Sequence, residues 1–166
     1  EVLEEKEIKT LALFFQLTKK EPSPLEKGRM FSELYNLGNS DSDISTITNY
    51  CQRYISQSRK GWDLYISNIN KINKMPNPKV LKEKGISLRH FGNLAESFIT
   101  LKNKNIDVAD DAAVAWIKKA IKCSWTAKEL KEEVANEYDL TIKKRVEDSS
   151  IKQEIADNNS EVVEEK

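Results

Sequence analysis

Cysteine, histidine and glycine are all scarce in this chain, and each shortage argues against a class of function. The 166 residues include two cysteines, one histidine and five glycines. Cys51, His90 and Cys123 stand far apart, so their spacing does not fit a zinc site. No Ser/His/Asp set, pair of catalytic carboxylates or glycine-rich phosphate loop can be assembled. We therefore expect no enzyme, no cofactor and no bound metal.

Long apolar runs are also missing. No stretch of eighteen apolar residues occurs, so we expect no membrane span, and no signal-peptide pattern opens the chain. The first residue is Glu1 and not Met, which indicates a fragment or a processed chain with neighbouring domains missing. The two isolated cysteines fit buried or half-buried thiols in a reducing compartment, so the expected location is cytoplasmic.

Strand signals are nearly absent, whereas helical periodicity recurs along the whole chain. There is no Asn-Gly or Asp-Gly hairpin, and apolar residues return at spacings of three and four. We predict an all-α fold, a multi-helix bundle that contains a helix-turn-helix and ends in a flexible acidic C-terminal tail. Helices are expected at residues 4–18, 24–37, 44–55, 62–73, 78–84, 88–101, 110–123 and 126–138.

Local signals place several helix ends and the domain boundaries. Ser23 is an expected N-cap, with Pro24 at the first helical position and Glu26 completing a capping box. Thr126 and Glu129 repeat that arrangement. We expect residues 1–20 to be a helix or linker from a preceding domain and 21–138 to be the main helical domain. Residues 139–166 are expected to form an acidic tail or linker that is frayed or disordered.

The net charge of zero hides a strong division along the chain. Residues 58–104 hold ten Lys/Arg against three Asp/Glu, a net charge of +7, whereas residues 129–166 hold six against twelve, a net charge of −6. A basic stretch of this kind is what phosphate binding requires, and a solvated lysine-rich face is the alternative.

The basic stretch contains the candidate DNA-binding element. We expect a polar turn over residues 56–61 and a recognition helix over residues 62–73, with Trp62, Ile66 and Ile69 facing inward. Arg and Lys suit guanine and phosphate, Asn suits adenine, and Ser suits phosphate. The predicted DNA-binding residues are Ser58, Arg59, Lys60, Asp63, Ser67, Asn68, Lys71, Lys74, Arg89 and His90.

Several short motifs resemble the central domain of ParB-type partition proteins. Residues 23–29 read Ser-Pro-Leu-Glu-Lys-Gly-Arg, like the family's first helix start, and residues 65–68 read Tyr-Ile-Ser-Asn, like a run in its recognition helix. Residues 80–87 resemble the following helix and its Gly-x-Ile-Ser turn, Arg89-His90 stands near the family's basic or histidine positions, and residues 125–130 resemble the closing helix. The similarity covers about residues 12–135.

The resemblance implies sequence-specific binding of double-stranded DNA for plasmid or chromosome partition. It further implies a ParA-type ATPase as partner, a homodimer in the full-length protein, and a nucleoid- or plasmid-associated location. The family's nucleotide-binding domain is absent apart from its last segment. Residues 15–19 read Phe-Gln-Leu-Thr-Lys where CTP-binding members carry Glu-Asn-x-x-Arg, so we expect no nucleotide hydrolysis.

Other interpretations remain open at this point. A ParB-like transcriptional repressor would use the same domain, and a helical protein-interaction adaptor would not touch DNA at all. His90 can contact phosphate or cap a helix. The tryptophans fit core anchors better than base-stacking platforms, and the three acids Asp107, Asp110 and Asp111 fit the start of a helix better than a cation site.

Overall fold

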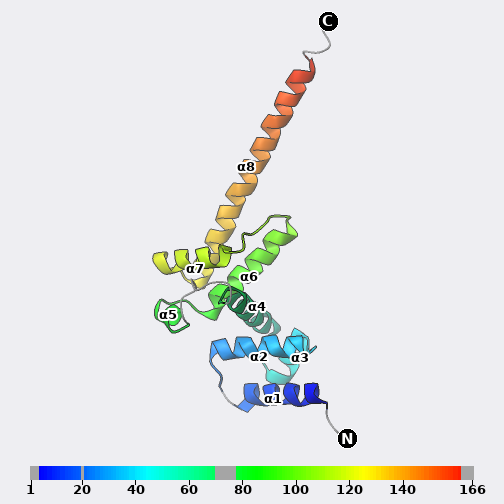
Figure 1. Ribbon diagram of the computed structural model, residues 1–166, viewed down its shortest axis with the longest axis vertical. Helices are drawn as coiled ribbons and strands as arrows, with labels where there is room; N and C mark the ends of the chain where they lie inside the picture. Colours follow the sequence, from blue (N-terminus) through cyan, green and yellow to red (C-terminus); the bar gives the residue numbers. More distant parts are fainter. Residues whose placement is uncertain (1–3, 20, 70–77, 162–166) are drawn as a thin grey trace. The chain divides into compact units, whose positions relative to one another are not determined.

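The computed structural model describes residues 4–19, 21–69 and 78–161, which form eight α-helices and no strand (Figure 1). The predicted all-α fold is therefore confirmed. None of these helices is both long enough and apolar enough to cross a membrane. The helices are α1 (Glu5–Lys19), α2 (Pro24–Asn36), α3 (Asp41–Thr48), α4 (Gln52–Ile69), α5 (Pro78–Glu83), α6 (Leu88–Asn103), α7 (Ala112–Cys123) and α8 (Ala127–Glu161).

The chain divides into two compact units, Glu1–Lys131 and Glu132–Lys166. The first unit holds α1 to α7 and the first residues of α8, and the second holds the rest of α8. Helix α8 runs past the expected end of the last firm helix near Tyr138, on to Glu161, through the segment expected to be a frayed helix or a disordered tail. Beyond Tyr138 the residues are mostly polar and the apolar stripe stops. Polar residues can still continue a helix, and residues 127–161 contain no Pro or Gly that would interrupt it.

Both hydrogen bonds of the predicted capping box at the start of α2 are present. The backbone N–H of Glu26 donates to Ser23 Oγ at 3.3 Å, and the backbone N–H of Ser23 donates to Glu26 Oε2 at 2.8 Å. After α2 the chain turns at Gly38, whose φ of 96° lies in the region that favours glycine. Thr126 and Glu129 exchange the same pair of hydrogen bonds at the start of α8.

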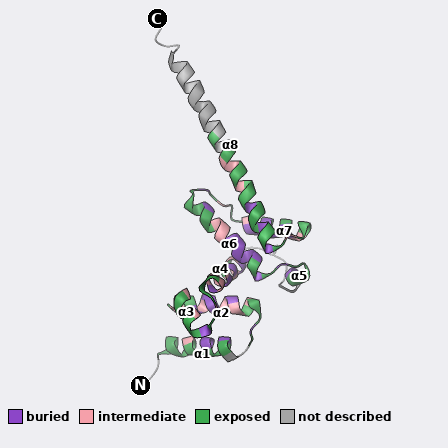
Figure 2. Cartoon of the chain, turned by 180° about the vertical axis from the view of Figure 1, so that it is seen from behind, coloured by how far each residue is buried: buried purple, intermediate pink, exposed green. Residues whose placement is uncertain are grey.

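A hydrophobic core joins the first four helices (Figure 2). Phe31, Leu34, Ile44 and Ile55 are its fully buried members, contributed by α2, α3 and α4. Each aliphatic or aromatic side chain of this size contributes about 1.5–3 kcal/mol when buried. The core is completed by α1 with Leu13, Phe14 and Leu17 and by Met30 of α2.

The predicted turn over residues 56–61 is wrong, since α4 is continuous from Gln52 to Ile69. Gly61 suggested a turn, but it sits where α4 crosses α6. A Cβ atom added to Gly61 would lie 2.7 Å from the backbone N of Gly92, and one added to Gly92 would lie 2.7 Å from the backbone O of Gln57. Both glycines therefore allow two helix backbones to touch.

The predicted helix over residues 44–55 is also wrong, because it breaks after Thr48. Asn49 adopts a left-handed conformation with φ 61° and ψ 9°, which Asn tolerates better than most residues. The break turns the following residues outward, so Cys51 is exposed instead of buried, and Cys123, the last residue of α7, is exposed as well. The expectation of buried or half-buried thiols is thereby corrected.

Candidate nucleic-acid interface

Two helices joined by a short turn lie about ten residues earlier than the predicted helix-turn-helix. Eight-residue α3 ends at Thr48, the three residues Asn49, Tyr50 and Cys51 form the turn, and α4 begins at Gln52. Two helices joined by a three- or four-residue turn are the geometry of DNA-binding helix-turn-helix units. The left-handed Asn49 takes the place that Gly often has in such turns. The first part of α4 is therefore the candidate recognition helix.

Aromatic side chains fix the turn to the core. The ring of Tyr50 lies 5.6 Å from that of Phe31, and the ring of Tyr54 lies 6.1 Å from it, both edge-on. Tyr50 and Tyr54 also contact each other at 5.7 Å, and Lys27 Nζ lies 5.0 Å from the centre of the Tyr50 ring. Edge-to-face aromatic pairs add about 0.5–1.5 kcal/mol each beyond burial, so the turn has a defined conformation.

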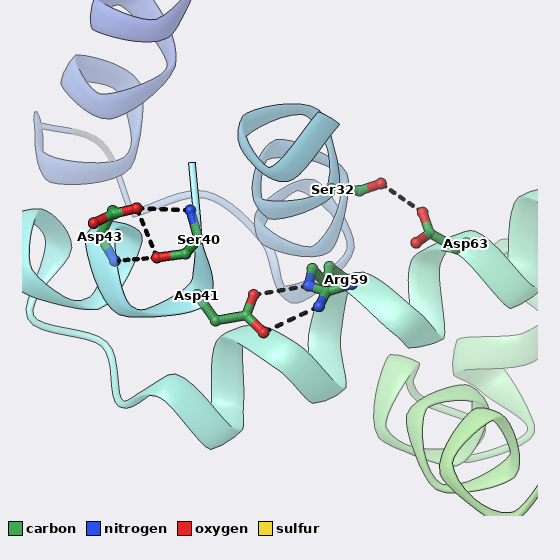
Figure 3. A network of polar contacts seen from close by, with 6 residues as sticks. All are labelled: Ser32, Ser40, Asp41, Asp43, Arg59 and Asp63. Carbon is green, nitrogen blue, oxygen red and sulfur yellow. Dashed lines mark hydrogen bonds and ion pairs between the residues drawn. The ribbon is translucent and has the colours of Figure 1, made fainter. Parts of the chain in front are cut away.

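Arg59 ties α4 to both preceding helices. Its Nε donates to Asp41 Oδ1 of α3 at 2.7 Å and its Nη2 to Asp41 Oδ2 at 3.1 Å (Figure 3). Its guanidinium also lies 3.6 Å from the centre of the Tyr35 ring of α2. Burial lowers the pKa of Arg59, but the hydrogen bonds and charge of Asp41 outweigh that effect and raise it. Arg59 was predicted to bind DNA at the entrance of the recognition helix; in the structure two of its donors bind Asp41 of α3 instead.

Asp63 makes a second polar link on the same side of α4. Its Oδ1 accepts a hydrogen bond from the hydroxyl of Ser32 in α2 at 2.5 Å (Figure 3). Asp63 remains exposed, as predicted. Its carboxylate carries negative charge and is already bonded within the fold, so it is a weak candidate for a DNA contact.

Four residues follow one another along the outward side of α4. Arg53, Ser56, Lys60 and Ser67 are separated by three, four and seven residues, so they share one helical face. Arg53 and Ser67 are exposed, and Ser56 and Lys60 are half-buried. We call these four residues the α4 outer face. It retains Lys60 and Ser67 from the predicted site and adds Arg53 and Ser56.

Two predicted readers, Ser58 and Asn68, are buried in the structure. Ser58 is 7% exposed and Asn68 is 5% exposed. The Asn68 amide donates to the backbone O of Leu64 at 2.8 Å, within its own helix. Both predictions are wrong for the same reason: continuous α4 rotates these side chains toward the protein instead of toward solvent. The neighbouring Tyr65, part of the partition-protein resemblance, is also buried.

His90, a predicted phosphate contact, is 4% exposed and serves as a bridge inside the fold. The backbone N–H of Ser87 donates to His90 Nδ1 at 3.1 Å, and His90 Nε2 lies 3.0 Å from the carbonyl oxygen of Trp125. An N–H can only donate and a carbonyl can only accept, so the proton sits on Nε2. His90 therefore caps α6 and binds the start of α8, and its assignment to DNA is corrected.

The remaining predicted residues divide into three groups. Arg89 is exposed at the second position of α6, where a DNA contact is geometrically open. Lys71 and Lys74 lie outside the described residues. Asp107, Asp110 and Asp111 are exposed just before α7, and the described part of the chain has no cluster of three metal-ligating side chains.

The tryptophans pack against other rings. Trp116 is buried and lies 6.5 Å from Trp125, and Trp62 lies 5.9 Å from Tyr65. This packing agrees with the interpretation of these residues as core anchors.

No family model, curated protein or solved structure matches this chain. Its function must therefore be inferred from the geometry of the chain itself.

The sequence did not point to Arg53 and Ser56, because the polarity of residues 56–61 and the presence of Gly61 indicated a turn there. The better local signal is Asn49, an amino acid that favours left-handed geometry, directly after a short stretch that opens with its own capping box. In that box the backbone N–H of Ser40 donates to Asp43 Oδ2 at 2.8 Å and that of Asp43 to Ser40 Oγ at 3.1 Å. A helix start at residue 41 and a left-handed stop at residue 49 together define α3.

Proposed function

We propose that this chain binds double-stranded DNA in a sequence-specific manner, with α3, the Asn49 turn and α4 as its helix-turn-helix. The observation that carries the proposal is the outer face of α4, which displays Arg53 in the first turn of the second helix. In this class of unit the N-terminal part of the second helix contacts base edges. Arg is the side chain that most often reads guanine, and Ser56 and Lys60 suit bases or phosphates.

The biological role that we propose is plasmid or chromosome partition, as a centromere-binding protein that works with a ParA-type ATPase. This part of the proposal rests on the partition-protein resemblance over residues 12–135. It assigns the full-length protein to a homodimer on the nucleoid or a plasmid. The chain's part is binding, with no catalytic step.

Selection from a pool of randomised duplexes tests the proposal. We expect one enriched site, and we expect Arg53→Gln to weaken binding to it by about 1–3 kcal/mol and to relax preference at one position. Lys118→Gln is the matched control, since Lys118 is an exposed cation on α7 far along the chain. A pool from which no sequence is enriched would refute sequence-specific binding.

One observation favours a second candidate, a protein-interaction adaptor. Ile8, Leu11 and Phe15 lie on one face of α1 and are 54%, 57% and 63% exposed. Apolar side chains on one helix face are typical of a protein contact. A salt titration separates the two functions, because DNA binding weakens steeply with ionic strength and an apolar helix contact does not.

A further inference from the structure

A groove of about 680 Å³ lies beside the first turns of α4, and its walls carry four basic side chains. The groove is lined by Arg53 of α4, Arg89 of α6, and Lys128 and Lys131 of α8, and also by Pro24 at the start of α2. None of the described residues that line it is acidic. We call it the basic groove.

Three of these cations occupy positions that the helices themselves disfavour. Arg53, Arg89 and Lys128 are each the second residue of a helix, in α4, α6 and α8. A helix N-terminus carries about half a positive charge, so a cation there is repelled, and a nearby anion is attracted. Helices α4 and α6 have no acid in the first turn, whereas α2, α3 and α8 do. Arg53 and Arg89 thus act against helix stability, and the cations of the groove together attract an anion.

One of the four cations has an ion-pair partner beside the groove. Lys131 Nζ lies 3.0 Å from Glu96 Oε2.

Buried hydrogen bonds fix the walls of the groove to one another. The Gln57 amide of α4 donates to Asn93 Oδ1 of α6 at 2.6 Å, and the Asn93 amide donates to the carbonyl oxygen of Ala127 in α8 at 2.5 Å. Asn93 is 6% exposed, so these bonds are shielded from water and hold the three helices in register. The positions of α4, α6 and the first residues of α8 around the groove are therefore set in advance of binding.

We infer that the basic groove binds the sugar–phosphate backbone of one DNA strand, next to the bases contacted by the outer face of α4. The inference rests on the proposed function and adds a sequence-independent contact to it. Arg53 carries the argument, because it belongs both to the α4 outer face and to the wall of the groove. A strand whose bases meet α4 passes the groove, where Arg89 and Lys128 contact its phosphates.

The test compares Arg89→Gln and Lys128→Gln with Lys118→Gln, which removes the same charge outside the groove. Duplex affinity is measured from about 50 to 300 mM salt. Each groove variant is expected to weaken binding to all sequences alike and to lower the slope of log affinity against log salt by roughly 0.9 for each phosphate that it no longer neutralises. The control keeps the wild-type slope. The thermal midpoint of Arg89→Gln is expected to stay level or rise, because this change removes a cation from a helix N-terminus that has no acid in its first turn.

Other outcomes overturn the inference in distinguishable ways. If the wild-type chain binds duplex DNA and both groove variants keep its affinity and salt slope, the groove is not the strand contact, while the proposed function stands. A variant that changes base preference but not the salt slope contradicts a phosphate contact as well. If the wild-type chain binds no duplex, the proposed function fails together with the inference. Binding of inorganic tripolyphosphate, seen in the amide signals of Arg89 and Lys128, would then identify a site for a free phosphate compound.

Discussion

The hydroxyl group of Tyr65 is buried and has no hydrogen-bond partner among the residues that the structure describes. Its ring lies between those of Trp62 and Phe91, at 5.9 and 5.3 Å. A buried polar group left without a partner costs about 1–3 kcal/mol of desolvation, whereas the ring itself packs well. The buried hydroxyl therefore lowers the free energy of unfolding, whereas the packing of the ring around it raises it.

Tyr65→Phe removes that loss and keeps the ring. We expect the free energy of unfolding, measured by urea titration at pH 7, to rise by about 1 kcal/mol. Tyr54→Phe is the control, since Tyr54 is only half-buried. A decrease in stability at position 65 would mean that the hydroxyl has a partner in solution.

The same residue predicts a pH dependence. Burial raises the pKa of Tyr65 above its ordinary value near 10. The folded chain therefore favours the neutral phenol of Tyr65. The stability linked to this preference is fully present below pH 10, the ordinary pKa in the unfolded chain, and is lost as the pH rises from there through the higher pKa of the folded chain. Urea titrations from pH 8 to 11 should show a steeper loss in the wild-type chain than in Tyr65→Phe, and equal slopes would contradict the burial.

Among single residues, the sequence predicted those whose partners are local. The caps at Ser23 and Thr126 depend on residues three positions away, so the motif alone identifies them. The burial of Asn68 and His90 depends on helices distant in the sequence, and polarity indicated solvent for both. A polar side chain is expected to be exposed unless the fold supplies a buried hydrogen-bond partner, as the Trp125 carbonyl does for His90.

At the scale of helices, the crossing of α4 and α6 depends on glycine. Gly61→Ala improves helix propensity by about 1 kcal/mol, but the added Cβ would lie 2.7 Å from the backbone N of Gly92 and 2.9 Å from the backbone O of Leu88. Backbone atoms cannot rotate away as side chains can, so the cost of overpacking exceeds the gain in helix propensity. We expect a net destabilisation of about 2 kcal/mol, measured as a lower thermal midpoint.

Ser67→Ala is the matched control for this change, because Ser67 is an exposed residue of the same helix. It is expected to leave the midpoint level or to raise it slightly. If Gly61→Ala is as stable as that control, α4 and α6 do not cross as closely as the structure places them.

The helix-turn-helix shows why helices were predictable and their junctions were not. Periodicity identified most of the helical segments, since it reports the face that each helix buries. It did not separate α3 from α4, because Ile44 and Ile55 both face the core across the turn. Only the backbone conformation of Asn49 distinguishes a break from a continuous stripe.

A substitution of Arg59 should separate a loss of fold stability from a loss of a DNA contact. Arg59→Lys keeps the charge but loses the two-pronged contact with Asp41 and the stacking on Tyr35. We expect the free energy of unfolding to fall by about 1–2 kcal/mol and α3 to lose its fixed position. Duplex binding should weaken without a change in its salt slope. An unchanged free energy of unfolding would contradict the role of Arg59 in holding α3.

At the scale of the whole molecule, zero net charge is the sum of opposed segments. The acidic stretch after residue 128 balances the basic middle of the chain. At about 0.15 M salt, charges separated by more than roughly 8 Å are screened, so the local cations decide binding and the net charge matters little. At about 0.01 M the screening length is near 30 Å, and the acidic segment then repels DNA along with the rest of the chain's negative charge.

Removing residues 139–166 tests this balance. The segment holds five Lys/Arg and eight Asp/Glu, so its loss changes the net charge from zero to +3. The compact unit with α1 to α7 ends at Lys131, so we expect the thermal midpoint to change by no more than about 2 °C. Duplex affinity should rise about three-fold or more at 10 mM salt and agree with the full chain at 150 mM. An advantage that persisted at 150 mM would require the acidic segment to occupy the DNA-binding surface directly, and a large drop in midpoint would require it to be part of the core.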